Sequence, residues 1–590
     1  MLKIKSIAVF TLLAASMSLS AAPADGTYQE SVMGHNAKFN LEVTIQNGRI
    51  TKIVTPGNLE SPGVGKLAIE KMADRIIDNQ SINVDGISGA TLTSFAVKQA
   101  VGKALKKAGA DDSFKKKVKQ VSALPDTIQS EVVIIGGGGA GLAAAVSALQ
   151  NGAKVTIVEK LGFLGGSTNV CGGAFNASDT RYQKALGIED NPQKHFEQTM
   201  KGGHNTNDPE LVHYLADNAK DALLWLESMG LVVNPKVGAA TGALYQRSHY
   251  PDPAGGNTYI RTLEKALQQY QDKVQVLLNT KALGLIEENG RVVGVEAQNY
   301  GRKVRVMGSK GVIITTGGFG ANIEYRQKVN TGIWKEANLD KNIGCSNISV
   351  AAQGEGLIMA DKVNADLIGL ADIQVHPNGT PGTGLMLDIK TSGRNRLFIN
   401  ELGDRFVNEG AARDVLSKAV FAQPNQTYWL VQNHLRYPDE NAIDLLSGRK
   451  MKDMLEQGRV KKAKNLDELA KMINVDVNRL RASIEEYNRV ARHEIPQDKF
   501  GFKANHTDDR PMTEGPWYFA KKVPTIHHTM GGIRINTKAE VLDKNGKVIP
   551  GLYAAGEVTG GIHGENRLGG NAVADLMVFG RTAGRVAASK

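Results

Sequence analysis

The sequence has only two cysteines, Cys171 and Cys345, among its 590 residues. Two thiols cannot supply the disulfide framework of a chain this long, and no CxxCH motif is present to attach a c-type haem. The content of hydrophobic (41%) and charged (22%) residues excludes collagen-like and mostly disordered proteins. Any electron transfer by this protein would therefore depend on other cofactors or on partner proteins.

Long apolar runs are absent except at the N-terminus, where Lys3 and Lys5 precede an uncharged, mostly apolar run at 7–15 and the small-residue stretch SMSLSAAPA. This order is typical of a secretion signal, and the run is too short to span a bilayer. We expect a signal peptide at 1–24, cleaved between Ser20 and Asp25, a periplasmic location and a mature protein without a membrane span. The alternatives are an uncleaved anchor and a buried N-terminal helix.

Acidic residues are outnumbered, 60 against 71 Lys and Arg, which gives a net charge of +11. Removal of the signal peptide deletes two lysines and no acid, so the charge falls to +9. The basic residues are scattered among acids, and an exported protein has no genome to bind, so nucleic acid is not an expected partner. The positive charge would attract small anions or an acidic partner protein. Alternatively, it reflects only a well-solvated surface.

The length predicts about four domains. Residues 27–54 alternate as strands do, with a turn at 46–48, and helices are expected at 64–77 and 94–107. Together they form a compact α+β unit, closed by the lysine-rich stretch 115–119 and the linker SALPDT. We find no internal repeat.

The segment DGISGAT lies inside this unit. Gly86 and Gly89 allow a tight turn that presents the Ser88 and Thr91 hydroxyls, and taken alone this is an ordinary turn with a helix cap. The segment resembles the flavin-attachment motif of FMN-binding domains in sodium-pumping quinone reductase subunits and exported fumarate reductase-like flavoproteins. That resemblance implies FMN bound to Thr91 through a phosphoester and a flavin transferase for maturation; a structural turn is the alternative.

A glycine turn follows the strand VVII, and Gly136, Gly138 and Gly141 satisfy GxGxxG. Glu159 ends the next strand of a complete strand, turn, helix and strand sequence. Such glycines let the backbone approach a pyrophosphate at a helix N-terminus, and the acid accepts hydrogen bonds from a ribose. The pattern predicts a dinucleotide site, with a tight structural turn as the alternative.

FAD is favoured over NAD by the glycines after Glu159 and by the C-terminal segment GLYAAGEVTGGIHGENRLGGNAVADLMVFGRTAGR. From about 129 to 590 the chain resembles the fumarate reductase and succinate dehydrogenase flavoprotein family. No histidine lies at 164–174, where membrane-bound members attach FAD covalently, so the resemblance implies noncovalent FAD. The implied cofactor contacts are Gly136, Gly138, Ala140, Gly141, Glu159, Ser167, Thr168, Gly172, Gly173, His528, Glu557, Ala572 and Val573.

Four segments resemble the family's catalytic set: QVHP with His376, AARD with Arg413, HHTMGG with His527, and ENRLGG with Arg567. Each alone has a plain structural interpretation, such as a core histidine or a surface ion pair. Reduction of a C=C bond conjugated to a carboxylate needs a hydride, a proton and positive charge for the developing enolate. The resemblance implies Arg567 and His527 on the carboxylate and Arg413 as proton donor.

The sequence departs from the fumarate reductases after His376. Their Thr-Glu pair falls on Asp388 and Ile389 and their relay arginine on Ser392, so another group must supply protons, with Lys390, Arg394 and Glu409 as candidates. An acid at 388 would repel a dicarboxylate by ~1 to 4 kcal/mol. It suits a far end that donates hydrogen bonds, as the ring of urocanate does; alternatively Asp388 points away or pairs with Lys390.

We therefore expect reduction of urocanate to dihydrourocanate, with His376 and Asp388 at the far end of the substrate. His376, retained from the fumarate pattern, argues instead for an anionic or hydroxylated far end. Fumarate, acrylate, methacrylate and aryl acrylates are alternatives, and a periplasmic flavin electron carrier is an alternative of another class. Because the chain has no haem motif, the expected electron donor is a separate periplasmic c-type cytochrome. No metal site is expected.

The predicted fold is an α/β Rossmann-like FAD-binding domain with an inserted α+β clamp, or capping, domain and a small N-terminal α+β FMN-binding domain. The expected bounds are 25–112 for the FMN-binding domain, 113–128 for a linker, 129–370 with 528–590 for the FAD-binding domain, and 371–527 for the clamp domain.

Overall fold

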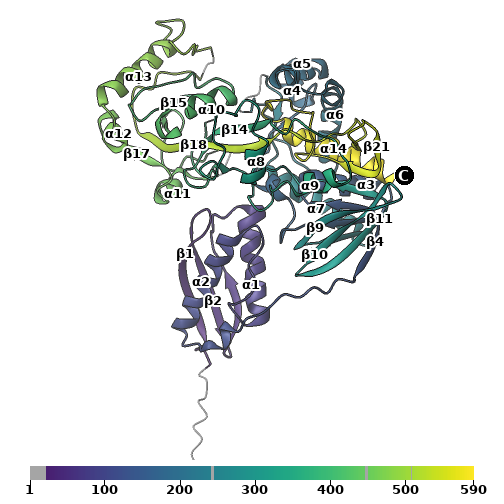
Figure 1. Ribbon diagram of the computed structural model, residues 1–590. Helices are drawn as coiled ribbons and strands as arrows, with labels where there is room; N and C mark the ends of the chain where they lie inside the picture. Colours follow the sequence, from purple (N-terminus) through teal and green to yellow (C-terminus); the bar gives the residue numbers. More distant parts are fainter. Residues whose placement is uncertain (1–21, 241–244, 392, 445–448, 506–507) are drawn as a thin grey trace, which may run out of the picture.

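The computed structural model describes residues 22–240, 245–391, 393–444, 449–505 and 508–590. A small N-terminal unit lies beneath a larger body, and an extended stretch leads from it to strand β4 (Figure 1). The larger body is built on an eight-stranded and a six-stranded sheet. No helix in the described part of the chain is both long and apolar enough to cross a membrane.

The N-terminal unit is an antiparallel meander of β1 (Gly26–Met33), β2 (Lys38–Gln46) and β3 (Arg49–Val54), covered by two helices. Buried and exposed residues alternate along β2, as a sheet with one covered face requires. Asn47 and Gly48 both have positive φ, 52° and 70°, which is the geometry of a two-residue hairpin turn. The expected turn at 46–48 is confirmed.

Both helices of this unit differ from the expectation at their N-terminal ends. A π-helical turn at Pro62–Lys66 precedes α1 (Leu67–Asn79), and α2 (Thr91–Lys107) begins three residues earlier than expected. The Ser94 hydroxyl accepts from Ile87 N at 3.0 Å and donates to Ala90 O at 2.9 Å, so it closes the turn that starts α2. Thr91 is therefore the first residue of a helix, and it is exposed.

The eight-stranded sheet carries the glycine-rich turn. Its order is β20-β21-β11-β4-β5-β8, and the hairpin of β9 and β10 extends it through β11. β4, β5 and β8 are parallel neighbours, as in a doubly wound fold. The strands are β4 (Thr127–Ile135), β5 (Val155–Val158), β8 (Val274–Leu277), β9 (Thr280–Glu288), β10 (Arg291–Asn299), β11 (Arg302–Ile314), β20 (Glu540–Leu542) and β21 (Val548–Ala554).

Helices α3 (Gly139–Gln150) and α14 (Asn571–Ala588) pack closely against each other beside this sheet (Figure 1). A Cβ atom at Gly580 or Gly584 would lie within 2.6 Å of α3 backbone oxygens, so only glycine allows this approach. The surrounding elements are β6 (Phe175–Asn176), α4 (Arg181–Ala185), α5 (Pro192–Gly202), α6 (Pro209–Ser228), β7 (Ser248–His249), α7 (Gly256–Leu267), α8 (Ile323–Lys328), α9 (Glu355–Lys362), β13 (Leu367–Ile368) and β19 (Gly532–Ile533).

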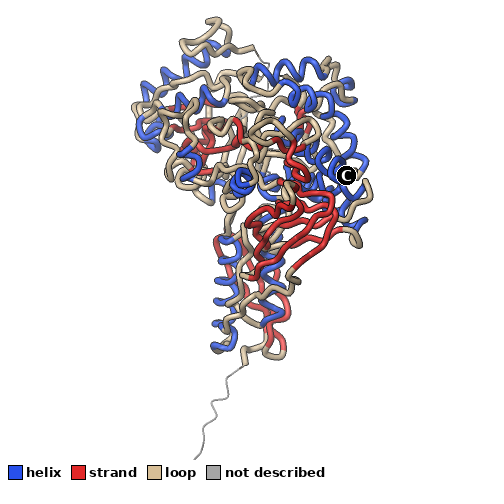
Figure 2. The backbone as a smooth tube through the Cα atoms, turned by 45° about the vertical axis from the view of Figure 1, so that its right-hand side comes forward, coloured by secondary structure: helices blue, strands red, loops and turns tan. Residues whose placement is uncertain are grey.

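The six-stranded sheet forms the second part of the body, and helices lie around its strands (Figure 2). Its strands are β12 (Gly344–Cys345), β14 (Ile373–Gly379), β15 (Arg396–Ile399), β16 (Tyr428–Asn433), β17 (Lys461–Ala463) and β18 (Trp517–Thr529). Its helices are α10 (Arg413–Phe421), α11 (Met451–Glu456), α12 (Leu466–Ile473) and α13 (Val477–Ala491). The long strand β18 pairs with β12, β14, β16 and β17 and so ties the whole sheet together.

The N-terminal unit contacts both parts of the body. The turn before α2 packs on the segment after Glu159: Gly162 N donates to Ser88 O at 3.2 Å, and Leu161 and Phe163 join the apolar core of the unit. On the other side, Arg459 of the second part donates to His35 O at 2.8 Å. The expected attachment turn thus lies directly against the segment that follows the dinucleotide motif.

Candidate functional site

The glycine turn between β4 and α3 has the geometry of a phosphate cradle. Gly136 has φ of +103°, and a Cβ at Gly141 would lie 1.9 Å from Gly136 O, so neither position accepts a side chain. A Cβ at Gly138 would meet nothing within 4 Å, which means that the turn is open on that side. Ala140 is buried in the first turn of α3, against Gly580. The helix N-terminus and the open turn suit a pyrophosphate.

Glu159 lies where a ribose partner is expected. Its Oε2 accepts from Gly137 N and its Oε1 from Leu161 N, both at 2.7 Å, and burial raises its pKa. Nearby, Thr168 accepts from Gly139 N at 3.3 Å, and Ser167 accepts from Ile348 N at 3.2 Å. Two more expected cofactor contacts are the glycines at 172 and 173. A Cβ at Gly172 would meet nothing within 4 Å, and the backbone turns at Gly173, which has φ of +79°.

The C-terminal half of the expected cofactor site joins this cradle. Glu557 accepts from Thr529 N at 3.1 Å, and burial raises the pKa of its carboxyl to about 7. Nδ1 of His528 lies 3.8 Å from Glu557, and Nε2 of His528 is buried without a hydrogen-bond partner. Ala572 and Val573 lie in the first turn of α14. FAD fits here, because a bound group could form hydrogen bonds with the unpartnered Nε2 of His528 and with the first NH groups of α14.

Two buried arginines form the centre of the expected substrate site. Nη1 of Arg413 and Nη2 of Arg567 donate to the same atom, Gln374 Oε1, at 2.8 and 2.9 Å. Both Nε atoms are buried without a partner, and in the described part of the chain no acid lies within 4.0 Å of either guanidinium. Burial lowers the pKa of Arg567 to about 10, and burial together with the charge of Arg567 holds the pKa of Arg413 well below its usual value.

Gln374 is a site residue that the sequence analysis did not single out, although it opens the QVHP segment. It lies on β14, and its Nε2 donates to Arg567 O at 2.8 Å and to Asn566 Oδ1 at 3.1 Å. These bonds fix the amide so that its oxygen faces the two guanidinium groups. An uncharged amide holds both cations without neutralising them.

His376 and His527 lie beside the arginines on the paired strands β14 and β18. Their ring centroids are 5.1 Å apart, and Nδ1 of His527 lies 2.8 Å from Ser346 Oγ. Burial, together with the nearby charge of Arg413, holds the pKa of both imidazoles well below the usual value, so both are neutral near pH 7. The structure therefore brings together four of the residues expected to contact substrate: His376, Arg413, His527 and Arg567.

Asp388 is not an unpaired acid beside Arg413 and Arg567. It forms an ion pair with Lys522 of β18, and its other oxygen accepts from Thr380 Oγ1 at 3.2 Å; both partners of the ion pair are fully buried. This corrects the expectation of an acid free to repel a dicarboxylate, and the alternative of a pair with Lys390, because the ammonium that neutralises Asp388 belongs to Lys522.

The three candidates for the proton relay have different surroundings. Glu409 accepts two hydrogen bonds from Arg405, at 2.9 and 2.7 Å, and Arg394 lies 3.5 Å from Asp509. Lys390 is half-buried, donates to Met386 O, and its charge acts on His376. Burial lowers the pKa of Lys390 to about 7, a value suited to proton transfer. Ile389 is part of an apolar cluster, and Ser392 lies outside the described residues.

The remaining expected residue, Thr91, lies in the N-terminal unit, away from this site. Its side chain is exposed at the start of α2, in the turn that packs on the segment after Glu159. Within the described residues no cluster of His, Cys, Asp and Glu has the arrangement of a metal site. The arrangement as a whole can bind an anion between two buried guanidinium groups beside a dinucleotide cradle.

Comparison with known proteins gives matches in both parts of the chain. Residues 131–573 match an FAD binding domain, and residues 34–106 match an FMN-binding domain. The chain is 35% identical to urocanate reductase of Eggerthella lenta, over 97% of this chain and 94% of that protein. It is 33% identical to NADH:acrylate oxidoreductase of Vibrio harveyi over 95% of its length, and it spans 61% of that longer protein.

Among solved structures, the open conformation of a flavocytochrome c3 fumarate reductase superposes with a TM-score of 0.65. The sequences are 32% identical, and the match covers 81% of this chain and 84% of that one. The expected FAD-binding fold with an N-terminal FMN-binding domain is confirmed by these matches.

Proposed function

The chain belongs to the FAD-binding domain family, among the fumarate reductase-like flavoproteins, and from this premise we propose that it reduces the C=C bond of an α,β-unsaturated carboxylate. One observation carries the proposal: Arg413 and Arg567 are buried, share one neutral amide oxygen and have no acid within ion-pair distance among the described residues. Burying unpaired cations is costly unless an anion compensates them. A substrate carboxylate supplies that anion.

Each residue of this group has a task that its geometry allows. Arg567 binds the substrate carboxylate through a charged fork, and the neutral His527, whose ring is held by the contact of its Nδ1 with Ser346, adds a hydrogen bond. The glycine cradle would hold FAD, which when bound would supply the hydride. Arg413 delivers a proton to the carbon next to the carboxylate, and its lowered pKa makes that transfer easier than from an ordinary arginine.

We propose urocanate as the substrate. The end-to-end similarity to a urocanate reductase supports this choice, as does an acid at position 388. Although both oxygens of Asp388 are engaged, a carboxylate has about four acceptor sites, so one more hydrogen bond from an imidazole N–H can form. The ion pair with Lys522 neutralises the charge of Asp388, which suits an uncharged ring.

Fumarate is a second candidate because of Lys390. This lysine is half-buried, its charge reaches His376, and no acid lies within 4.0 Å of its Nζ among the described residues. A protonated Lys390 would favour a second carboxylate at the far end of the substrate.

A substrate panel with reduced viologen as donor tests the reaction and its substrate together. Urocanate, fumarate, acrylate, methacrylate and cinnamate are compared with the wild type and with Lys390→Met. We expect the highest kcat/KM for urocanate, and Lys390→Met should lower fumarate turnover more than urocanate turnover. Fumarate as the best substrate of the wild type would overturn the choice of urocanate. Absence of turnover with every enoate would leave a flavin electron carrier as the function.

We also propose that FMN is attached covalently to Thr91, which is exposed at the start of α2. Thr91→Ala should abolish the flavin adduct measured by mass spectrometry under denaturing conditions, and it should leave viologen-driven enoate reduction largely unchanged, because the substrate site lies in the larger body. Ser88→Ala, which removes an exposed hydroxyl from the same turn, is the matched control. An adduct that persists in Thr91→Ala contradicts the assignment.

The remaining proposals concern the setting of the enzyme: export to the periplasm through residues 1–24, maturation by a flavin transferase, and reduction by a c-type cytochrome. The first 21 residues lie outside the described part of the chain. N-terminal sequencing of protein purified from the periplasmic fraction tests export, and a mature chain that begins at Met1 would contradict it.

A further inference from the structure

Asn571, the first residue of α14, is held by three side chains from two other elements, Asn176 of β6 and both His195 and Thr199 of α5. Its Oδ1 accepts from Asn176 Nδ2 at 2.8 Å and lies 3.0 Å from Nε2 of His195. Its Nδ2 donates to Thr199 Oγ1 at 3.0 Å. Asn571, Asn176 and His195 are each at most 1% exposed, and Thr199 is 2% exposed. Water does not compete for these bonds.

The residues before Asn571 are fixed by the same strand. Asn176 N donates to Gly570 O at 3.0 Å, and Asn176 Nδ2 also donates to Gly569 O at 2.8 Å. Gly570 has φ of +92°, and a Cβ there would lie 2.1 Å from Asn176 Oδ1. The backbone just before α14 therefore has one position, which Asn176 defines.

His195 acts in this network as a neutral donor. Burial lowers its pKa to about 4, so the ring is uncharged at neutral pH, and the bond to Asn571 Oδ1 places its proton on Nε2. Nδ1 of His195 is buried without a hydrogen-bond partner. The contact of Nε2 with Asn571 is therefore the one hydrogen bond that the His195 ring makes among the described residues.

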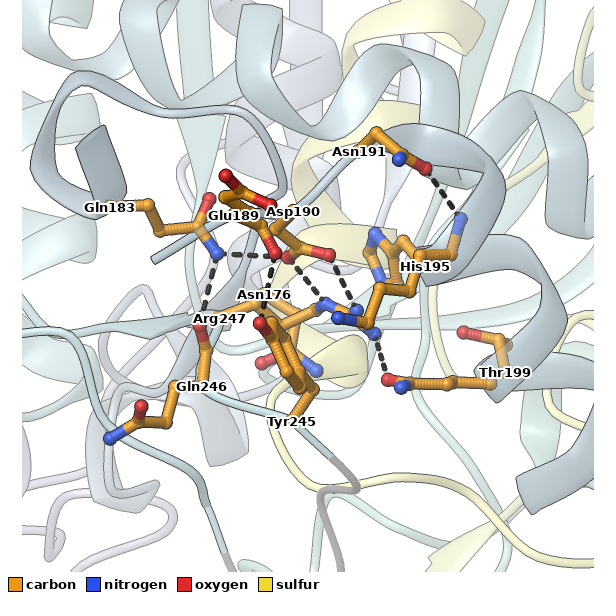
Figure 3. A network of polar contacts seen from close by, with 12 residues as sticks. Asn176, Gln183, Glu189, Asp190, Asn191, His195, Thr199, Tyr245, Gln246 and Arg247 are labelled. Carbon is orange, nitrogen blue, oxygen red and sulfur yellow. Dashed lines mark hydrogen bonds and ion pairs between the residues drawn. The ribbon is translucent and has the colours of Figure 1, made fainter. Parts of the chain in front are cut away.

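An outer set of buried polar groups supports the inner one (Figure 3). Arg247 donates to both oxygens of Asp190, at 3.0 and 2.8 Å, and Asp190 also accepts from Gln183 Nε2 at 2.8 Å. The next residue, Ser248, donates to Asn176 Oδ1 at 2.7 Å. A two-point ion pair thus fixes the strand that orients the Asn176 amide.

We propose that His195, Asn176 and Thr199 are positioning residues that aim the N-terminus of α14 at bound FAD and thereby set its reduction potential. The inference rests on the proposed FAD-dependent function. Ala572 and Val573, the expected flavin contacts, directly follow the tethered Asn571. NH groups in the first turn of a helix lack partners within the helix, and they stabilise negative charge placed before them. Reduction adds negative charge to a flavin. If the N-terminus of α14 is displaced from the flavin, the reduced form loses this stabilisation and the oxidised form is favoured.

The test compares His195→Leu with His195→Gln in the FAD-loaded full chain, with dye-equilibrated redox titration as the readout. The Leu variant loses the donor to Asn571, whereas the Gln amide can replace it. We expect the Leu variant to favour oxidised FAD about tenfold more than the wild type, a shift of about 30 mV for a two-electron couple. The Gln variant should return most of the way to the wild-type potential.

His213→Leu is the matched control, because His213 stacks on Phe196 of α5 and is exposed outside the network. It should leave the potential unchanged. If His195→Leu does not fold, Thr199→Val, which removes only the acceptor for Asn571 Nδ2, is titrated in its place and should shift the potential in the same direction by less. The proposal would be overturned if His195→Leu folds, binds FAD and has the wild-type potential. The same result for Thr199→Val would overturn it where that variant replaces His195→Leu.

Failure of the proposed function would be separately visible. A wild type that binds FAD but reduces no enoate contradicts the proposed reaction, while the potential difference between the variants still decides the role of His195. Because the pKa of His195 is about 4, the potential difference between wild type and His195→Leu should be constant from pH 6 to 8. A difference that changes across this range contradicts the role of a neutral donor.

Discussion

Two groups of buried cations lie in the larger body, and they are compensated in different ways. Arg413 and Arg567 share a neutral amide oxygen and have no acid within ion-pair distance among the described residues. Lys522 is equally buried, but it forms an ion pair with Asp388. A paired cation is part of the folded structure, whereas cations held only by uncharged groups, here an amide and a backbone carbonyl, are suited to an anion that binds later.

The comparison separates groups that bind from groups that stabilise. Removing a member of the arginine group should change catalysis more than folding. Removing a member of the ion pair should change folding more than catalysis. The predictions below test this division, from the largest expected effect to the smallest.

Arg413→Ala should lose nearly all turnover while it retains FAD and binds substrate. The variant lacks the proton donor, and a positioned acid contributes typically ~10²- to 10⁴-fold in rate. Steady-state kinetics with reduced viologen measures kcat and KM separately. A loss expressed mainly in KM, with kcat preserved, would show that Arg413 only binds the substrate.

Asp388→Asn should lower the free energy of unfolding by ~3 to 5 kcal/mol, because it leaves the Lys522 ammonium buried without its acid. Denaturant unfolding monitored by tryptophan fluorescence measures the change. Asp404→Asn is the control, since its pair with Arg479 is half-exposed and surface pairs contribute ~0 to 1 kcal/mol. Equal effects of the two substitutions would remove the distinction drawn between the cation groups.

Arg567→Gln should raise KM for the enoate, with a loss in kcat/KM of roughly ten- to a hundredfold. A hydrogen bond to a charged group contributes ~1.5 to 3 kcal/mol, and each ~1.4 kcal/mol corresponds to a factor of ten. The unfolding midpoint should stay at or above the wild-type value, because an uncompensated buried charge is removed. A lower midpoint with unchanged KM would place Arg567 among the stabilising cations.

Lys390→Met should flatten the pH dependence of stability above pH 7. Burial lowers the folded-state pKa of Lys390 from 10.5 to about 7, so between these values the unfolded chain binds the additional proton. Stability therefore rises with pH in this window, by at most ~1.4 kcal/mol per pH unit from this group. Denaturant unfolding of wild type and variant at pH 7, 8 and 9 measures this pH dependence. Parallel profiles would contradict the lowered pKa of Lys390.

Local patterns in the sequence predicted the elements that local forces control. Asn47-Gly48 between alternating strands gave the hairpin, and the glycine turn after VVII gave the cradle before α3. The start of α2 was missed by three residues, because Ser94 closes that turn with hydrogen bonds that no periodicity reveals.

The candidate site could be predicted only in part. Motifs located His376, Arg413, His527 and Arg567, yet they did not single out Gln374, which differs from an ordinary strand residue only through its partners in space. The partner of Asp388 was also missed. Lys522 lies 134 positions along the chain, and only the pairing of β14, β16 and β18 brings it to the acid.

The sequence by itself determined the kinds of cofactor domain, the glycines that a phosphate cradle requires, and the charged groups available for an enoate carboxylate. Tertiary structure alone decided which of those charges are compensated, because compensation depends on distances between strands and helices that are far apart in sequence. The same holds for α14: glycine and asparagine at 570 and 571 are visible in the sequence, but the tethers from Asn176, His195 and Thr199 exist only in the folded protein. Burial and distance set the strength of a charge or hydrogen bond, and neither is a property of a residue in an unfolded chain.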